Sequence, residues 1–175
     1  MALSYAMRSL IDELTKDIIH KYNIQIPINN IDEIVIRMGG RLRESSDLSE
    51  YSDGVVRKLD ENSFEIMVSK YQGNERKNFT VAHEIGHLFL HMGYKIDPEK
   101  WRQNCRTYYR NGDSQEEYEA NEFAAALLMP KEEYRRVMYK YVKENWVDTS
   151  KIAQEFHVSI NAASNRGKWL GLLEW

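Results

Sequence analysis

Hydrophobic residues near the N-terminus recur with a helical period. Leucines and isoleucines at three- and four-residue spacings between residues 10 and 19 predict an amphipathic helix that ends before Pro27. A second helix is predicted over residues 31–38, because Asn30 can cap it, Glu33 occupies the capping-box position and two glycines follow it. We therefore expect the chain to begin with two helices.

The period then changes to that of β-strands. Residues 55–59 and 64–68 are short β-branched or alternating runs on either side of a polar turn at residues 60–62, which predicts a hairpin. Residues 41–44 are a candidate third strand. A small antiparallel sheet is therefore expected to follow the first two helices.

A helical pattern returns in the rest of the chain. It covers residues 79–92, 115–129 and 131–143, and residues 149–173 predict two short helices around a turn at residues 157–159. The fold class that follows is α+β, mainly helical with a small antiparallel sheet.

The linker of residues 93–114 is long for a compact domain, and loops of this length usually carry function. It contains Tyr94, Tyr108 and Tyr109, any of which could stabilise an oxyanion above a catalytic site. It also contains Cys105, which we expect to be a packed or loop thiol because no second soft ligand lies near it.

Composition narrows the class of protein. With 175 residues, 42% of them hydrophobic and 29% charged, the chain has the size of one compact domain. The single cysteine favours a reducing, cytoplasmic location, and the N-terminus has no sustained apolar stretch preceded by positive charge, as a signal peptide would need. The longest apolar run, residues 123–129, is too short for a membrane span. A net charge of −3 is not typical of a nucleic-acid binder, so nucleic acid is only a minor hypothesis.

The most informative segment is His83-Glu84-Ile85-Gly86-His87, a His-Glu-x-x-His motif inside a predicted helix. Residues four apart project from one helix face, so both imidazoles can bind one metal ion while Glu84 lies beside an activated water. The alternative is a pair of histidines that only packs into the core. As a metal site, the motif favours zinc with one further protein ligand and an open position for water.

The motif alone does not decide the third ligand. His91 lies about 12 Å from His83 along a straight helix at 1.5 Å per residue, so three imidazoles of one helix cannot converge on one ion. We therefore expect His91 to be a packing residue or a residue that orients a ligand from behind.

Better candidates for the third ligand lie in residues 115–129. Glu117 shares a helix face with Asn121 and with two alanines. These alanines would allow close packing on the helix that carries the His-Glu-x-x-His motif. A carboxylate on that face needs a partner, which a metal would supply, and Asn121 could orient a ligating histidine. The residues alone leave Glu119 open as an alternative ligand. The glutamates expected on a solvated acidic face are Glu116, Glu119 and Glu122.

Two stretches together resemble the ImmA/IrrE family of metallopeptidases. They are FTVAHEIGHLFLH at residues 79–91 and EYEANEFAAALLMP at residues 117–130. The resemblance implies a zincin-like fold of the gluzincin type. It implies zinc bound by His83, His87 and Glu117, with Glu84 as the general base and Asn121 orienting a histidine.

The resemblance also implies a role. Members of the family typically relieve repression by cleaving a neighbouring repressor that has a helix-turn-helix domain, and many are encoded on phages and mobile elements. We therefore expect a cytoplasmic zinc-dependent endopeptidase that cleaves a partner repressor, with Glu84 taking a proton from a metal-activated water. Some relatives carry fused DNA-binding or sensor domains, for which this chain is too short, so a minimal, ImmA-like form is expected.

Residues 147–175 are expected to form a C-terminal helical segment packed on a metallopeptidase domain of residues 1–146. Residues 152–163 resemble a helix-turn-helix unit. The polar residues of its second helix that could reach nucleic acid are Asn161, Asn165, Arg166 and Lys168. Two other functions thus stay open: a non-catalytic antirepressor that binds metal only to fold, and a DNA-binding regulator. An intact Glu84 favours chemistry, because a structural metal site needs no base.

Overall fold

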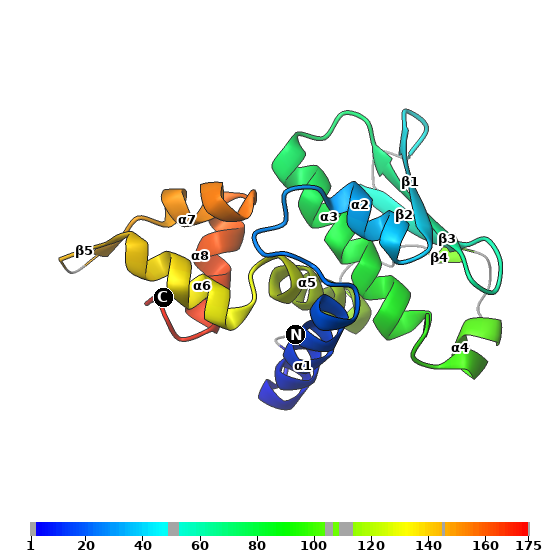
Figure 1. Ribbon diagram of the computed structural model, residues 1–175, viewed down its shortest axis with the longest axis horizontal. Helices are drawn as coiled ribbons and strands as arrows, with labels where there is room; N and C mark the ends of the chain where they lie inside the picture. The colour runs from blue at the N-terminus through cyan, green and yellow to red at the C-terminus, as the bar shows by residue number, and fades with distance from the viewer. Residues whose placement is uncertain (1–2, 49–52, 104–106, 109–113, 145, 175) are drawn as a thin grey trace.

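The computed structural model shows a mainly helical protein with one small sheet and describes residues 3–48, 53–103, 107–108, 114–144 and 146–174 (Figure 1). In chain order the elements are α1 (Tyr5–Lys21), α2 (Ile31–Arg37), β1 (Gly40–Ser45), β2 (Gly54–Lys58), β3 (Phe64–Ser69), α3 (Asn74–Gly86), the π-helical turn η1 (His87–His91), α4 (Pro98–Gln103), β4 (Thr107–Tyr108), α5 (Gln115–Leu128), α6 (Lys131–Lys140), β5 (Val142–Lys143), β6 (Trp146–Val147), α7 (Thr149–Phe156) and α8 (Ile160–Trp169). None of the helices in the described part is long and apolar enough to cross a membrane.

Both predicted N-terminal helices are confirmed. The side chain of Asn30 caps α2 by accepting a hydrogen bond from the backbone N–H of Asp32 at 3.2 Å. Its amide donates to Glu33 Oε1 at 3.0 Å, so the capping-box glutamate contacts the cap through the side chain.

The sheet has the strand order β1-β3-β2-β4. Strands β2 and β3 form the predicted antiparallel hairpin, with Val56 opposite Ile66. The strand β1 lies where it was expected but pairs in parallel with β3, so the expectation of an antiparallel sheet is wrong and the sheet is mixed. Side chains alternate with the same period in both kinds of pairing, which is why the pattern could not give the direction. In the sequence β2 follows β1 and precedes β3. Because β2 runs antiparallel to β3, the strands β1 and β3 point the same way.

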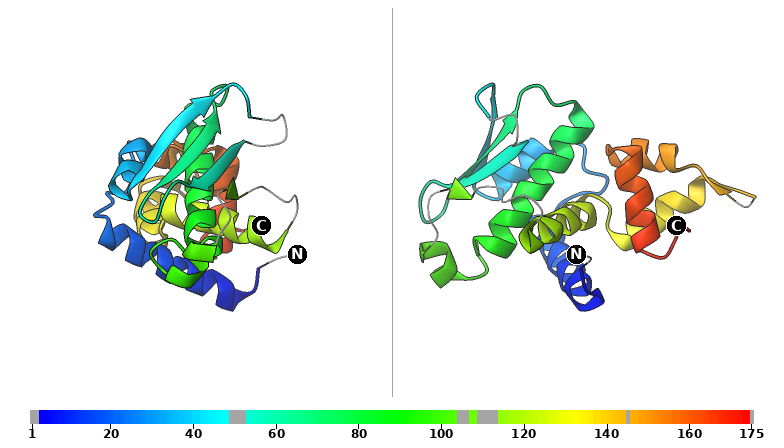
Figure 2. Two further views of the ribbon diagram at one scale, coloured as in Figure 1. Left: turned by 90° about the vertical axis from the view of Figure 1, so that its right-hand side faces the viewer. Right: turned by 180° about the vertical axis from the view of Figure 1, so that it is seen from behind.

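Helix α3 crosses one face of the sheet and packs against α5 (Figures 1 and 2). The two helices approach closely at Gly86, where an added Cβ would lie 3.1 Å from Ala120 Cα and 3.2 Å from Phe123 Cβ. Small residues at this crossing therefore bring the motif helix and the glutamate-rich helix together, as their sequences indicate.

The linker before α5 contains two elements that the sequence did not predict, α4 and β4. Within it, Tyr94 is only 1% exposed, and its hydroxyl lies 2.7 Å from the Met38 carbonyl oxygen and 2.9 Å from that of Asn62. Burial raises the pKa of Tyr94 to about 12. Tyr94 is thus a core residue and not an oxyanion donor. The structure does not describe the side chain of Tyr108. Tyr109 and Cys105 lie outside the described residues.

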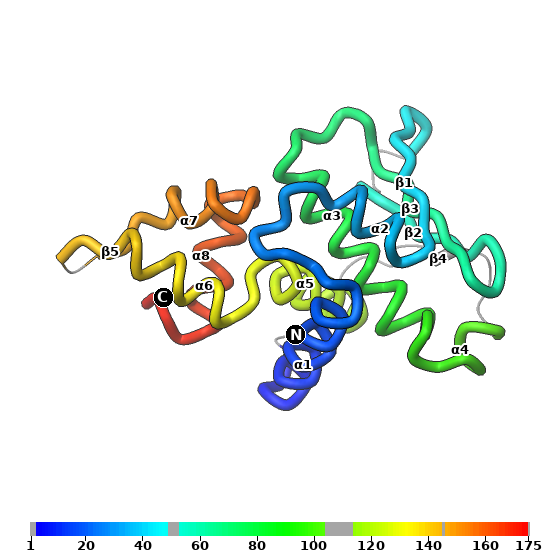
Figure 3. The backbone as a smooth tube through the Cα atoms, viewed as in Figure 1, coloured from blue at the N-terminus to red at the C-terminus, as the bar shows by residue number. Residues whose placement is uncertain are grey.

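Helices α6, α7 and α8 form a C-terminal unit at the end of the molecule opposite the sheet, with α1 and α5 between the two (Figures 1 and 3). The two short helices around residues 157–159 are confirmed, whereas the β5–β6 hairpin before them was not predicted. Tyr134 of α6 donates a hydrogen bond to the Ala163 carbonyl of α8 at 2.7 Å, and burial raises its pKa to about 12. The domain boundary expected at residue 146 stays a prediction. Helix α6 precedes that residue but packs within the C-terminal unit.

Candidate metal centre

The two motif histidines lie on the buried side of α3 and at its junction with η1. His83 and His87 are each 1% exposed, and their Nε2 atoms lie 2.9 Å apart. The sequence predicted one continuous helix over residues 79–92. The structure instead changes from α-helix to a π-helical turn at His87, and such turns are frequent at functional sites.

Glu117 reaches this pair from the first turn of α5. Its Oε2 atom lies 3.2 Å from His83 Nε2 and its Oε1 atom 3.3 Å from His87 Nε2. Ligand atoms of the three residues all lie within 4.8 Å of one another. The hydroxyl of Ser114 accepts a hydrogen bond from the Glu117 backbone N–H at 3.3 Å, so a helix cap fixes the turn that carries the carboxylate.

The outer nitrogens of both rings have protein partners. His83 Nδ1 lies 3.0 Å from Asn121 Oδ1, and His87 Nδ1 lies 2.8 Å from His91 Nδ1. In a neutral imidazole the nitrogen that carries the proton is a donor and the other is an acceptor. If His83 donates from Nδ1 to Asn121, its Nε2 lone pair faces Glu117 and His87.

His91 and Glu119 form a second layer behind this arrangement. His91 Nε2 lies 3.1 Å from Glu119 Oε2, and burial lowers the pKa of the His91 imidazole below its ordinary value, which favours the neutral ring. His91 contacts the cluster at His87, and Glu119 contacts His91. His91 thus lies where a residue that orients a ligand from behind is expected, and its role stays a prediction. Glu119 was expected on a solvated acidic face, but its side chain is only 14% exposed.

Glu84 is buried between α3 and the sheet, with 2% of its surface exposed. A Cβ added at Gly54 of β2 would lie 3.0 Å from Glu84 Oε1 and 2.6 Å from Thr80 Cγ2. The absence of a side chain at Gly54 thus lets the strand approach the carboxylate. Our sequence reasoning missed Gly54 and Thr80, although a glycine at a strand end is a recognised signal of close approach.

A cavity of about 440 Å³ reaches the cluster at His83. Its wall includes Asp53 and Arg76, which form an ion pair at 2.5 Å. The lining also includes Ser159, from the turn between α7 and α8. The C-terminal unit therefore contributes to the cavity at His83, which sequence reasoning did not anticipate.

Two charged residues that the sequence left on the surface are buried. Arg166, which was only a minor candidate for nucleic-acid contact, is 2% exposed, and its guanidinium donates to Glu122 at 2.9 Å and to Asp12 at 2.7 Å. Glu122, expected on a solvated face, is 9% exposed for the same reason. Packing of α8 on α1 and α5 buries the two residues together. The remaining candidates of α8, which are Asn161, Asn165 and Lys168, are not buried.

The donor set fits a metal ion. Two imidazole nitrogens and a carboxylate converge on one point from two helices, and they match the three protein ligands of catalytic zinc sites, which keep one position open. Asn121 and His91 supply the outer hydrogen bonds that metal-ligating histidines usually make.

Known proteins resemble this chain in fold and in sequence family. The structure is similar to that of a protein described as a Mycobacterium tuberculosis transcriptional regulator, with a TM-score of 0.54 and 16% sequence identity over 89% of this chain. The chain spans 45% of that regulator's length, and the likeness concerns the fold. No curated protein sequence matches the chain. The model of peptidase family M78, the IrrE N-terminal-like domain, matches residues 39–168. Since this match covers most of the chain, including His83, His87 and Glu117, the protein belongs to the ImmA/IrrE family.

Proposed function

We propose that this protein is a zinc-dependent endopeptidase of the gluzincin type. His83, His87 and Glu117 would hold the zinc ion. The observation that carries the proposal is the convergence of their ligand atoms next to a buried Glu84, in a chain of a peptidase family. A site that only stabilised the fold would fill its fourth position with another protein ligand and would need no such base.

The chemistry follows from the residues around the cluster. When bound, zinc would polarise the substrate carbonyl and lower the pKa of a water molecule. Glu84 would accept the proton of the attacking water on its carboxylate and deliver it to the leaving amine nitrogen. Its burial against β2 restricts the carboxylate to few orientations, which favours this proton transfer.

Residues behind the cluster would fix the geometry of the ligands. Asn121 would hold the His83 ring through Nδ1, and His91 would do the same for His87. Glu119 in turn would position His91. Such outer hydrogen bonds keep the Nε2 atoms directed at the ion and set the basicity of the ligands.

The proposed substrate is a helix-turn-helix repressor protein, cut in a flexible segment. Family membership supports this choice, and the similar solved structure carries the description of a transcriptional regulator. The cavity of about 440 Å³ at His83 offers room for side chains of a polypeptide.

The test is a comparison of the wild type with Glu84→Gln on a repressor encoded by a neighbouring gene. The amide keeps the shape of the side chain but cannot accept a proton, so zinc should stay bound while the cleavage rate falls by about 10²–10⁴-fold. Fragments resolved by gel electrophoresis and mass spectrometry provide the readout.

A matched control is Glu13→Gln, which changes an exposed glutamate of α1 and should leave cleavage unchanged. Equal cleavage by wild type and Glu84→Gln would exclude Glu84 as the base. Binding of the repressor without cleavage by either protein would favour a non-catalytic antirepressor.

A further inference from the structure

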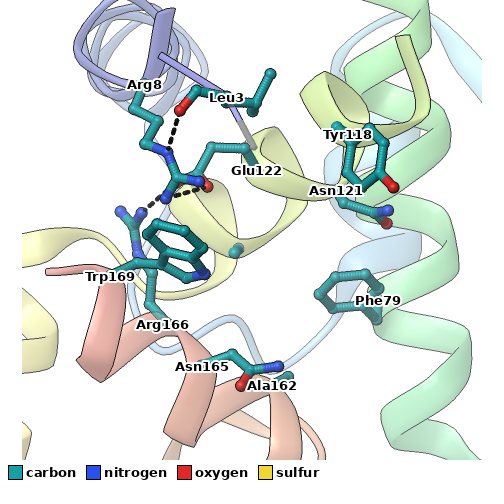
Figure 4. A pocket seen from close by; sticks show the side chains of 11 residues that line it. Leu3, Arg8, Phe79, Tyr118, Asn121, Glu122, Ala162, Asn165, Arg166 and Trp169 are labelled. Carbon is teal, nitrogen blue, oxygen red and sulfur yellow. Dashed lines mark hydrogen bonds and ion pairs between the residues drawn. The ribbon is translucent and has the colours of Figure 1, made fainter. Parts of the chain in front are cut away.

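A second cavity, of about 580 Å³, lies between α8 and the helices α3 and α5 (Figure 4). Its volume is within the range of about 300–1,000 Å³ that is typical of ligand pockets. Phe79 of α3 lines this cavity and also the cavity at His83, so the two cavities are neighbours on either side of one ring. We call the two cavities together the α3–α8 groove.

One face of α8 lines this groove. Ser159, the N-cap residue of α8, lines the part at His83. The second cavity is lined by residues three and four positions apart on the helix, which are Ala162, Asn165 and Trp169. Residues with this spacing share a helix face. The helix α8 thus lines the groove from its N-terminus to its last turn.

The charged wall of the second cavity has no excess charge. A carboxylate oxygen of Glu122 lies 3.4 Å from Arg8 Nη1, and the other lies 2.9 Å from Arg166 Nη1. Asp12 lies 2.7 Å from Arg166 Nη2. Because two guanidinium groups face two carboxylates, this wall favours neither an acidic nor a basic ligand.

The rest of the lining is mainly apolar. The ring of Phe79 points into the space between α3 and α8, and Tyr118 of α5 adds a second ring (Figure 4). Ala125 and Ala162 have small side chains, which leave the space open. Burial of apolar surface against such walls is favourable, so the cavity suits a large uncharged side chain.

We propose that the α3–α8 groove binds the polypeptide substrate and that the second cavity binds a large apolar side chain of it. This inference rests on the proposed peptidase function. Phe79 precedes His83 by one helical turn, about 6 Å along α3, and an extended peptide spans that distance with about two residues. The bound side chain therefore belongs to a residue about two positions from the bond that is cut. Ala125 and Ala162 set the size of the side chain that fits.

The first test uses peptides that span the site at which the repressor is cut. Two series carry Leu, Ala, Asp or Lys two positions before or two positions after the cut bond. In one of the two series the Leu peptide should be cleaved with a kcat/KM at least about ten-fold above the other three, which is the discrimination that a hydrophobic pocket provides.

A variant of α8 links this preference to the cavity. Ala162→Phe fills the space and should lower kcat/KM for the Leu peptide by at least about ten-fold, while the Ala peptide is cleaved as by wild type and the zinc content is unchanged. The matched control is Ala6→Phe, which adds the same ring at an exposed position of α1 that lines neither cavity and should behave as wild type.

The second test does not depend on cleavage. The uncharged fluorescent probe N-phenylnaphthylamine should bind the metal-free full chain at one saturable site. Ala162→Phe should weaken this binding by at least about ten-fold, because a buried apolar group loses its contacts. If Ala162→Phe does not fold, Asn165→Trp, at an exposed residue of the same face of α8, replaces it in both tests.

The outcomes separate this inference from the proposed function. Cleavage with equal kcat/KM for the Leu and Ala peptides in both series would overturn the groove and leave the peptidase function in place. A Leu preference or a probe affinity that survives Ala162→Phe would do the same. Failure of the zinc-loaded wild type to cleave the repressor would instead refute the peptidase function and, with it, the substrate assigned to this groove.

Discussion

Helix α5 carries two buried glutamates whose surroundings differ. Glu117 lies 3.2 Å and 3.3 Å from the Nε2 atoms of His83 and His87. Glu122, on another face of the same helix, lies 2.9 Å from Arg166 Nη1 and 3.4 Å from Arg8 Nη1. The two carboxylates are similarly buried, at 7% and 9% exposure, so burial does not distinguish them.

The partners distinguish them. Arginine is a permanent cation, so Arg166 neutralises Glu122 within the chain. Imidazole nitrogens, unlike a guanidinium, can serve as metal ligands, and those of His83 and His87 lie next to Glu117. A metal ion is a group that two imidazoles and a carboxylate bind together. The first cluster (His83, His87 and Glu117) therefore has the donor set of a metal site, whereas the second (Glu122, Arg166 and Asp12) is an ion-pair network within the chain.

The largest expected effect is the loss of zinc when the two histidines of the first cluster are replaced. The wild type should bind about one zinc per chain, and the double variant His83→Ala with His87→Ala should bind none, because only one of the three ligands remains. Metal analysis after dialysis measures this directly.

The control for metal content is the double variant His20→Ala with His157→Ala, which changes two exposed histidines. It should keep the zinc of the wild type. Full zinc occupancy in the His83 and His87 double variant would show that the metal lies elsewhere.

Most of the first cluster could be predicted from the sequence. His83, Glu84 and His87 belong to one helix, where spacing alone fixes the shared face. The residues favoured Glu117 from its place beside Ala120 on the next long helix but left Glu119 open, and the family resemblance selected Glu117. The structure brings the face of Ala120 onto Gly86. The change to a π-helical turn at His87 was not predicted, because a run of buried residues has no period that separates the two helix types.

The second cluster could not be predicted from the sequence. Glu122 and Arg166 are 44 positions apart in the chain, on helices whose packing no local pattern specifies. The expectation that Glu122 lies on a solvated face was wrong. The minor hypothesis that Arg166 contacts nucleic acid does not fit its burial either, and in both cases the residue is buried against the other. The parallel direction of β1 escaped prediction because pairing direction is also a tertiary property.

The second expected effect is on stability. Arg166→Met removes the cation that Glu122 and Asp12 share, which should lower the free energy of unfolding by about 3–5 kcal/mol. Denaturant titration of the metal-free protein measures it. Metal analysis of the folded variant should still find zinc, because the metal ligands are untouched.

The exposed arginine of α6 provides the control for this stability effect. Arg135→Met should change the free energy of unfolding by less than about 0.5 kcal/mol, since Arg135 pairs with Glu132 at the surface. A loss of similar size in both variants would mean that the buried network adds nothing. Loss of zinc from folded Arg166→Met would mean that the two clusters are not independent.

The smallest expected effect concerns Asn121, which lies on α5 between the two clusters. Asn121→Ala removes the acceptor of His83 Nδ1 and should weaken zinc binding by about 10–100-fold, since outer hydrogen bonds orient ligating histidines. Asn121→Asp keeps an acceptor oxygen in the same place and should restore most of the affinity. Competition with a zinc-chelating dye measures all three proteins. Asn165→Ala, which changes an exposed asparagine of α8, should bind zinc as the wild type does. Equal affinity of Asn121→Ala and wild type would show that the orientation of His83 is set by packing of α3 alone.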